Sequence, residues 1–150
     1  MNKLAPIPII ALFLCLNVSA QNWKYDFEEA KTLAKEENKN ILLLFTGSDW
    51  CPPCIKMERN ILSKDRFKEF ADSNFVWVKA DFPKRKRNRL PEDQRKKNEA
   101  LADKYNKKWV FPVILVINKD GNVLGATGYR KRMTVDGYIS LLTTINSFGK

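Results

Sequence analysis

Three short apolar runs, separated by segments with helical spacing, constrain the fold of this 150-residue chain more than any other feature. Residues 41–45 are continuously apolar, as is typical of a strand buried on both faces. A second predicted strand covers 75–80, and a third covers 111–117. The turn residues 118–121 lead from the third strand to a fourth at 123–127, which predicts an antiparallel hairpin.

Helix signals lie between these strands and after them. Asp26, Ser63 and Thr134 are the predicted N-caps of three helices, and Pro91 begins a fourth, polar helix. This order of elements predicts an α/β fold in which helices flank a mixed central β-sheet. The length of the chain and the absence of repeats or low-complexity linkers favour a single domain.

The first part of the chain has the pattern of a secretory signal. Its start is positively charged, residues 4–16 are apolar, and small residues precede Gln21. The apolar stretch is shorter than the roughly 20 residues that span a bilayer, so a membrane anchor is disfavoured. We therefore expect a signal peptide at 1–20, cleavage after Ala20, and a mature domain at 21–150 in the periplasm or outside the cell.

The residue counts exclude several classes of site. The chain has no histidine, which removes Ser-His-Asp and Cys-His nucleophile pairs and every zinc site that uses histidine. Its three cysteines are too few for a zinc site made of four thiolates. Cys15 would leave with the signal peptide, so the mature chain would keep Cys51 and Cys54. We expect no metal and no other cofactor.

Cys51 and Cys54 are three residues apart at the predicted start of a helix. At this spacing the two side chains are neighbours on one face and can close a disulfide. Cys54 shares a buried stripe with Met57 and Ile61. Cys51 is expected to be exposed at the positively polarised helix end, which favours a thiolate. The pattern therefore predicts that Cys51 attacks and Cys54 resolves during thiol–disulfide exchange.

Two other interpretations of the cysteine pair stay open. The pair could be half of a zinc site, although the sequence offers no ligands for the other half. It could also be an inert structural disulfide, although so short a loop stabilises a fold little in the chain-entropy model. In that second case the domain would be a binding module without redox turnover.

A five-residue motif follows the first buried strand: Trp50, Cys51, Pro52, Pro53 and Cys54. It resembles the Trp-Cys-x-x-Cys active-site motif of thioredoxin-like proteins, and the likeness continues in order over residues 23–148. The resemblance implies a thioredoxin-like fold. It also implies that Phe111 and Pro112 lie opposite the cysteines, with Pro112 in the cis form that the family carries.

The resemblance assigns substrate contacts to residues beside the cysteines. The backbone of Phe111 would pair with an extended substrate peptide, and Pro112 would shield the attacking cysteine and hold it for attack. Trp50 either lines this substrate surface or packs half-buried beside it. Trp77 and Phe82 are interpreted as core residues.

Two positions depart from the family pattern. Leu44 matches the buried aspartate with which thioredoxin helps to deprotonate its resolving cysteine. Pro52 replaces the usual glycine, which stiffens the loop and removes one N–H donor. Because Pro53 also lacks an N–H, the Cys54 N–H is the nearest donor left for the Cys51 sulfur. Both departures bear on the rate and the redox potential but leave the exchange mechanism intact.

The run from Lys84 to Arg89 contains five basic residues. Dense positive charge binds phosphates, but export and the lack of interleaved aromatic residues disfavour a nucleic-acid partner. A solvated loop is the favoured interpretation. Attraction to acidic protein partners or to an anionic membrane surface is the alternative.

These observations predict a periplasmic or secreted thiol–disulfide oxidoreductase whose partners are protein thiols and disulfides. We expect a reductase or isomerase more than a strong oxidant, because no histidine or other cation between the cysteines stabilises the Cys51 thiolate. Asp49 would oppose that thiolate if its carboxylate pointed toward it. A reductant in an oxidising compartment also needs an electron donor, and we expect a membrane-embedded thiol transporter in that role.

Overall fold

The structure is a computed structural model that describes residues 22–149, so the predicted signal peptide lies outside the described residues. Its elements are α1 (Phe27–Glu36), β1 (Asn40–Thr46), α2 (Pro52–Met57), the π-helical turn η1 (Glu58–Leu62), α3 (Asp65–Asn74), β2 (Phe75–Asp81), the 3₁₀ turn η2 (Lys86–Asn88), α4 (Glu92–Tyr105), β3 (Val113–Ile117), β4 (Val123–Gly128) and α5 (Val135–Ser147). No helix in this part of the chain is long and apolar enough to cross a bilayer.

The four strands form one sheet in the order β2-β1-β3-β4. β1 runs parallel to β2 and antiparallel to β3, and β4 completes an antiparallel hairpin with β3. In the hairpin turn Gly121 has a φ of 92°, a left-handed conformation that favours glycine. Leu42 in β1 is opposite Trp77 in β2 and Val116 in β3, and all three are buried. The predicted mixed sheet with its hairpin, and the core position of Trp77, are confirmed.

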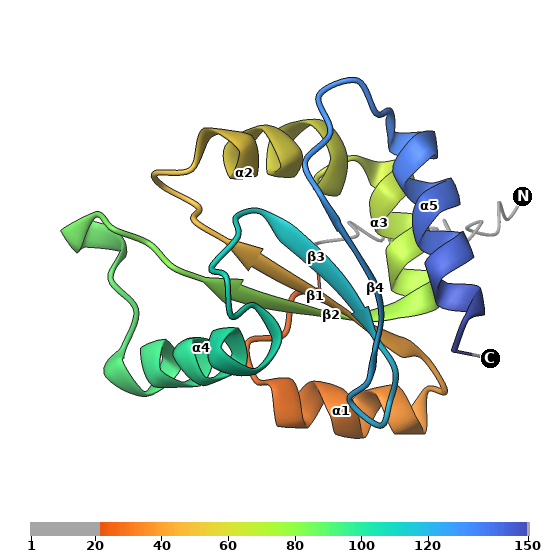
Figure 1. Cartoon of the computed structure of the whole chain (residues 1–150), viewed down its shortest axis with the longest axis horizontal. Coiled ribbons are helices and arrows are strands. Elements are labelled where there is room, and N and C mark those ends of the chain that lie inside the picture. The colour runs from red at the N-terminus through yellow and green to blue at the C-terminus, as the bar shows by residue number, and fades with distance from the viewer. Residues whose placement is uncertain (1–21, 150) are drawn as a thin grey trace, which may run out of the picture.

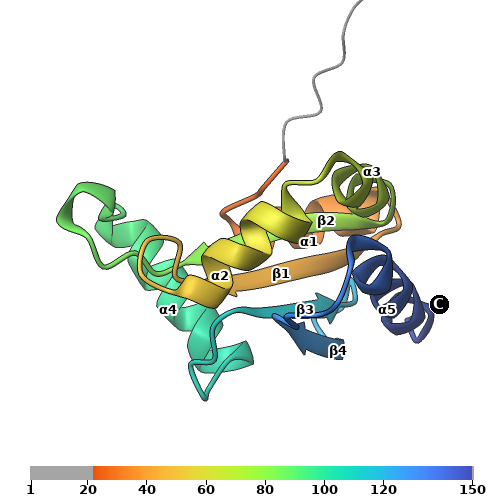
Figure 2. The ribbon, with the colours of Figure 1, turned by 90° about the horizontal axis from the view of Figure 1, so that it is seen from above.

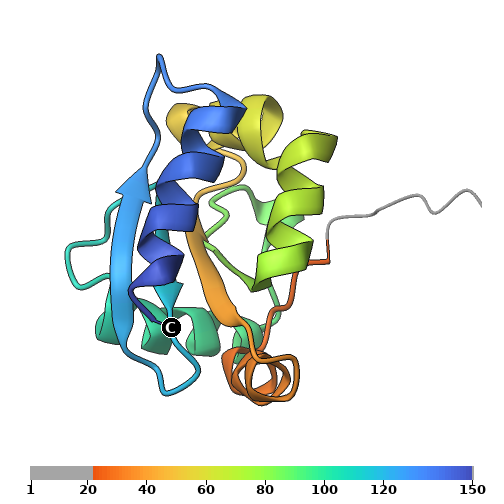
Figure 3. The same cartoon turned by 90° about the vertical axis from the view of Figure 1, so that its right-hand side faces the viewer.

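Helices cover both faces of the sheet. α2, α3 and α5 lie on one face, and α1 and α4 lie on the other (Figure 1). Seen from the side of the first group, α2 lies over β1 (Figure 2). A third view shows α3 and α5 next to each other (Figure 3). The arrangement is an α/β sandwich in which β1 is the central strand, with helices above and below it.

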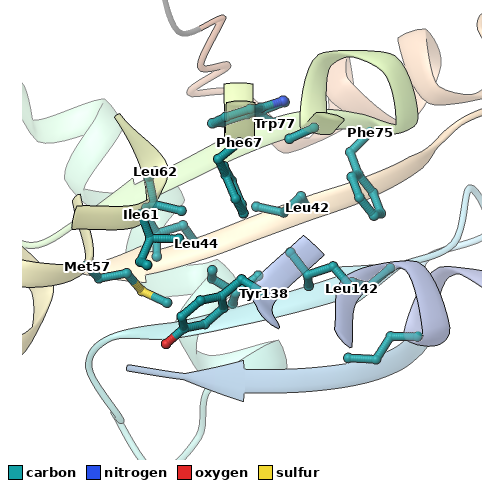
Figure 4. Close-up of a cluster of buried hydrophobic side chains, with 14 residues drawn as sticks. Leu42, Leu44, Met57, Ile61, Leu62, Phe67, Phe75, Trp77, Tyr138 and Leu142 are labelled. Atoms are coloured by element: carbon teal, nitrogen blue, oxygen red, sulfur yellow. The ribbon is translucent and has the colours of Figure 1, made fainter. Parts of the chain in front are cut away.

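β1 contributes to both cores because alternate side chains point to opposite faces of the sheet. Leu42 and Leu44 pack among side chains from η1, α3 and α5 (Figure 4). Ile41, Leu43 and Phe45 pack in the second core, with residues of α1 and α4. The continuous apolar run is therefore required by burial on both sides, as the sequence predicts.

Two of the three predicted N-caps are confirmed. In the first turn of the helix that follows, Asp26 accepts two backbone N–H groups and Thr134 accepts one. The prediction for Ser63 is wrong: it ends η1, and its hydroxyl donates to the Arg59 carbonyl four residues back at 3.0 Å. α3 begins after Lys64, which makes no side-chain cap.

Candidate active site

The chain path from β1 to α2 places the cysteine motif at the end of the central strand. β1 ends at Thr46, and α2 begins at Pro52. Gly47 leaves room for the indole of Trp50, since a Cβ atom at Gly47 would lie 2.5 Å from Trp50 Cε2. The Cys51 N–H donates to the Gly47 carbonyl at 3.0 Å. This tight turn fixes Trp50 and Cys51 beside the strand end.

Cys51 and Cys54 form a disulfide at the N-terminus of α2, with their Cα atoms 5.2 Å apart. Cys51 is the N-cap residue, and its Sγ accepts the Cys54 N–H at 3.3 Å. Pro52 and Pro53 occupy the first two helical positions, where a missing N–H breaks no intrahelical bond. The motif opens the helix as predicted, and the Cys54 N–H is the donor that the prolines leave for the Cys51 sulfur.

The prediction that Cys51 is exposed is wrong for this disulfide-bonded structure. Cys51 is 4% exposed and Cys54 is 3% exposed, so both are buried. The physical reason is the capping geometry: the Cys51 side chain turns back onto the first turn, toward the Cys54 N–H and sulfur. Position distinguishes the two residues instead, because Cys51 caps the helix end and Cys54 lies inside the first turn.

A cavity of about 300 Å³ adjoins Cys54, and we call it the inner cavity. Beside it, the Gly47 N–H donates to Cys54 Sγ at 3.5 Å. Lys79 on β2 and Glu58 on η1 both line the cavity, and the Lys79 Nζ atom lies 3.5 Å from a Glu58 carboxylate oxygen. The Lys79 ammonium also lies 4.5 Å from the centroid of a Trp23 ring, in a cation–π contact. The inner cavity is therefore lined by Cys54 and by the Glu58–Lys79 ion pair.

Leu44, which matches the buried aspartate of thioredoxin, is buried and pairs in register with Lys79 of the neighbouring strand. A carboxylate is nevertheless present near Cys54, because Glu58 follows it by one helical turn. Neither Glu58 nor Lys79 was predicted from the sequence. The four-residue spacing between Cys54 and Glu58 could have indicated that the two side chains lie on one helix face. The position of Lys79 near Cys54 follows only from the register of β1 with β2, which a sequence pattern does not contain.

Phe111 and Pro112 lie at the same end of the sheet as the motif. The next residue, Val113, is opposite Phe45 near the end of β1. The Phe111–Pro112 peptide bond is cis, as the family resemblance implies. The Phe111 ring meets the Trp50 ring edge-to-face, with centroids 5.7 Å apart. Trp50 is half-buried in this packing, as one of the two expectations for it states, and its contact with substrate stays a prediction.

A groove of about 470 Å³ begins at Trp50, and we call it the basic–aromatic groove. Four aromatic side chains line it: Trp50, Phe82, Trp109 and Phe111. Phe82 is central to this group, with its ring centroid 5.2 Å from that of Trp109 and 5.4 Å from that of Phe111. Phe82 packs against the second core, with its ring centroid 6.5 Å from that of Phe45, as its interpretation as a core residue predicts, and it is partly exposed in the groove as well. Trp109 was not singled out from the sequence; its position three residues before the cis-proline was the available signal.

The basic–aromatic groove is also rich in cations: Lys84, Arg85, Arg89 and Arg95 line it. Arg95 is paired with Glu99 at 2.6 Å, one of two acidic residues in the lining. The other, Asp81, accepts hydrogen bonds from Ser48 and from the Phe82 N–H. Within residues 22–149, the side chains of the other three cations form no ion pair. The groove thus presents unpaired positive charge next to aromatic rings.

Asp49 ties the basic loop, residues 84–89, to the cysteine motif. Its carboxylate accepts the N–H groups of Lys84 at 2.9 Å and Arg85 at 3.0 Å, and the Asn88 side-chain amide at 2.9 Å. These bonds, that of the Lys84 N–H first, hold the pKa of Asp49 below its ordinary value of 3.8. The carboxylate thus faces the loop, which projects beside the turn before α2 (Figures 1 and 2). The condition under which Asp49 would oppose a Cys51 thiolate is not met.

Comparison with known proteins agrees with the fold and the motif. A family model described as Thioredoxin-like matches residues 22–119. The chain belongs to the thioredoxin-like family. The predicted family and the predicted single-domain thioredoxin-like fold are therefore confirmed.

Relatives of this thioredoxin-like protein include two from Chlamydia pneumoniae. Disulfide bond reductase DsbH is 40% identical over 113 residues, which cover 75% of this chain and 66% of DsbH. Thioredoxin-related protein DsbJ is 29% identical over 101 residues, which cover 67% of this chain and 28% of DsbJ. A solved structure of DsbH oxidoreductase has a TM-score of 0.76 and 32% identity, and the match covers 98% of this chain and 94% of that one. The sequence matches span only part of the length of both C. pneumoniae proteins.

Proposed function

We propose that this thioredoxin-like protein is an exported thiol–disulfide oxidoreductase that reduces or isomerises disulfides in protein substrates. The observation that carries the proposal is the Cys51–Cys54 disulfide at the N-terminus of α2, with the Cys54 N–H on the Cys51 sulfur. Donors at a helix N-terminus stabilise a thiolate at that position. The similarity to DsbH, a disulfide bond reductase, supports the same activity for this chain.

The cycle starts from the dithiol form. The Cys51 thiolate attacks one sulfur of a substrate disulfide and forms a mixed disulfide, while the other substrate sulfur leaves as a thiolate. The Cys54 thiolate then attacks the Cys51 sulfur and displaces the second substrate thiolate. The substrate gains two electrons, and the protein ends as the Cys51–Cys54 disulfide that the structure describes. A donor dithiol must return two electrons to close the cycle.

The surroundings of Cys51 favour a reductant over a strong oxidant. A strong oxidant needs a deeply stabilised thiolate, because such a thiolate makes the reduced form the favourable one. Here Pro52 and Pro53 withdraw two backbone donors from the helix end, and Lys56, the first cation after the motif, is exposed to solvent. We expect a reduction potential nearer the roughly −270 mV of thioredoxin than the roughly −120 mV of the oxidising extreme.

The location and the electron source are further parts of the proposal. With residues 1–20 as a cleaved signal peptide, the mature protein would start at Gln21 in the periplasm or outside the cell. There, a membrane-embedded thiol transporter is the expected donor of reducing equivalents. N-terminal sequencing of the exported protein tests the first point: we expect Gln21, and an exported chain that still begins at Met1 would contradict it.

Turnover separates the oxidoreductase from a binding module with an inert disulfide. We expect the purified protein to accelerate the reduction of insulin by dithiothreitol, and the Cys51→Ser variant to give only the uncatalysed rate. Equilibration of the Cys51–Cys54 pair with glutathione then gives the potential. A wild-type protein that leaves the insulin rate unchanged would identify the binding module.

A further inference from the structure

We propose that the basic–aromatic groove binds an acidic segment of the substrate polypeptide, next to the disulfide that is reduced. This inference rests on the proposed function and adds to it the class of substrate. It makes the groove a specificity site for polypeptides in which glutamate or aspartate, together with an apolar side chain, lies near a disulfide.

The groove is continuous with the site of exchange. Trp50, which directly precedes Cys51, lines the groove. Phe111, which directly precedes the cis-proline, lines the groove as well. The two rings touch edge-to-face at 5.7 Å. A substrate chain that presents its disulfide to Cys51 therefore reaches the groove within a few residues, since an extended chain advances about 3.3 Å per residue.

The charge of the groove favours a carboxylate. Lys84, Arg85 and Arg89 line it and form no ion pair within the described residues. The acidic residues of the lining are already engaged, Glu99 by a 2.6 Å ion pair with Arg95 and Asp81 by three hydrogen bonds. An entering carboxylate would therefore meet unpaired guanidinium groups, which can bind it in a bidentate way.

The aromatic rings favour an apolar side chain beside the acid. Trp109 is 44% exposed although it packs edge-to-face on Phe82, and it therefore offers free aromatic area toward the groove. The Lys84 ammonium lies 3.9 Å from the centroid of a Trp50 ring, so charge and aromatic surface meet at the motif itself. Aromatic and arginine side chains in a partly enclosed site are typical of residues that dominate binding energy.

A polypeptide fits these observations better than a lipid surface. An anionic bilayer would attract every exposed cation of the basic loop, Lys86 and Arg87 included. Those two residues are exposed and do not line the groove, whereas Arg85 and Arg89 do. The loop therefore contains two pairs of cations with equal charge: Arg85 and Arg89 line the groove, and Lys86 and Arg87 do not. Substitution of one pair or the other distinguishes binding in the groove from long-range attraction.

The test uses three synthetic peptides with one intramolecular disulfide each and one phenylalanine beside it, flanked by Glu-Glu, Gln-Gln or Lys-Lys. The second-order rate constant for their reduction by the reduced full-length mature protein is measured at about 10 mM and about 500 mM salt. At low salt we expect the Glu-Glu peptide to react roughly tenfold faster than the Gln-Gln peptide, since two partly exposed ion pairs supply about that factor. High salt should remove most of this advantage.

Two double variants, each of which removes two positive charges, are the decisive comparison. Arg85→Gln/Arg89→Gln should lose most of the preference for the Glu-Glu peptide, while Lys86→Gln/Arg87→Gln should keep most of it. Trp109→Ala should slow the peptides that carry phenylalanine and leave matched peptides with alanine in its place unchanged. Reduction of the small neutral disulfide 2-hydroxyethyl disulfide should be equal in all three variants and the wild type.

Several results would overturn the inference. Equal rates for the Glu-Glu and Gln-Gln peptides would show that the groove does not select acidic substrates. Equal losses in the two double variants would show attraction at long range without a site. Vesicles of phosphatidylglycerol that bind the wild type and not the Arg85→Gln/Arg89→Gln variant, without any peptide preference, would assign the cations to a lipid surface. Failure with 2-hydroxyethyl disulfide as well would instead count against the proposed oxidoreductase activity.

Discussion

The inner cavity and the basic–aromatic groove adjoin different ends of one short motif, and they are built differently. The inner cavity meets Cys54, has a volume of about 300 Å³, and holds a paired carboxylate and ammonium, Glu58 and Lys79. The groove meets Trp50, has a volume of about 470 Å³, and is lined by aromatic rings and by three cations, Lys84, Arg85 and Arg89, whose side chains form no ion pair within residues 22–149. The inner cavity is lined mainly by residues of β1, α2, η1 and β2. The groove is lined mainly by the segments that connect β2 to α4 and α4 to β3.

This difference matches two tasks that the proposed disulfide reductase would perform. A resolving thiol has to give up a proton, and a charged pair that lines the same cavity suits that task. A substrate has to be selected and held, and loops with free charge and exposed rings suit that one. Substitutions on the two sides should therefore fail in different ways: those in the inner cavity should change how fast any substrate is released, and those in the groove should change which substrate is used.

The cysteines themselves give the largest expected effects. Cys51→Ser should abolish exchange with every substrate, because the attacking thiolate is gone. Cys54→Ser should retain attack and accumulate mixed disulfides, because nothing displaces the substrate from Cys51. Non-reducing electrophoresis after mixing with a disulfide substrate measures both. If the Cys51→Ser protein formed mixed disulfides and the Cys54→Ser protein formed none, Cys54 would be the attacking residue and Cys51 the resolving one. The exposed fractions of the two residues, 4% for Cys51 and 3% for Cys54, do not exclude that result.

Glu58→Gln should give the next largest effect. We expect the Glu58 carboxylate, which lines the same cavity as Cys54, to accept the proton of the Cys54 thiol, so its loss should slow resolution of a preformed mixed disulfide by roughly tenfold to a hundredfold near pH 7. The loss should shrink as the pH rises, because the Cys54 thiol then ionises without help. Single-turnover release of the second substrate thiol, followed against pH, measures this.

The matched control for that experiment is Glu92→Gln, which removes a carboxylate of the same type that pairs with Lys96 at 2.9 Å on α4. It should leave resolution unchanged. A loss in Glu58→Gln that is the same at every pH would mean that Glu58 only supports the local structure through Lys79, and it would weaken the contrast between the two cavities.

Local rules in the sequence predicted the framework side well. The run 41–45 had to be a central strand because both of its faces are apolar, and the structure buries it completely. Two prolines after Cys51 marked the first turn of α2, since only there does a missing N–H cost nothing. The stripe of Cys54, Met57 and Ile61 is buried as its spacing predicts.

The groove could not be predicted in the same way, because no local pattern contains it. It brings together Trp50, Phe82 and Trp109 from three separate segments, and only the sheet order places those segments at one end of the molecule. The basic run also contains no aromatic residue, so the rings that accompany it are invisible until the chain folds. The error for Cys51 has a related cause: helix position predicts where a residue lies, but a capping side chain can turn inward.

Asp49→Asn tests whether the groove depends on its connection to the motif, and its effect should be smaller than that of Glu58→Gln. The asparagine keeps one acceptor oxygen but loses the charge that holds Lys84, Arg85 and Asn88. We expect the preference for the Glu-Glu peptide over the Gln-Gln peptide to fall by roughly twofold to fivefold, with reduction of 2-hydroxyethyl disulfide unchanged. A loss with the small disulfide as well would show that Asp49 shapes the exchange site directly.

The smallest effect is the titration of Asp49 itself. Its pKa is lowered, first by the Lys84 N–H and then by the Asn88 amide, so the ionised carboxylate holds the basic loop throughout the neutral range. Because the folded-state value lies below the ordinary 3.8, the stabilisation from this group is present above pH 3.8 and is lost as the pH falls through the lowered value.

The backbone amides of Lys84 and Arg85 report this change, since both donate to the carboxylate. In ¹⁵N NMR spectra of the mature protein we expect their shifts to move together with a midpoint below 3.8, and to stay constant over that range in Asp49→Asn. A midpoint at or above 3.8 would mean that the loop is not held by this carboxylate in solution, and the groove would then depend on contacts that do not involve Asp49, such as the hydrogen bond from Trp50 Nε1 to the Phe82 carbonyl.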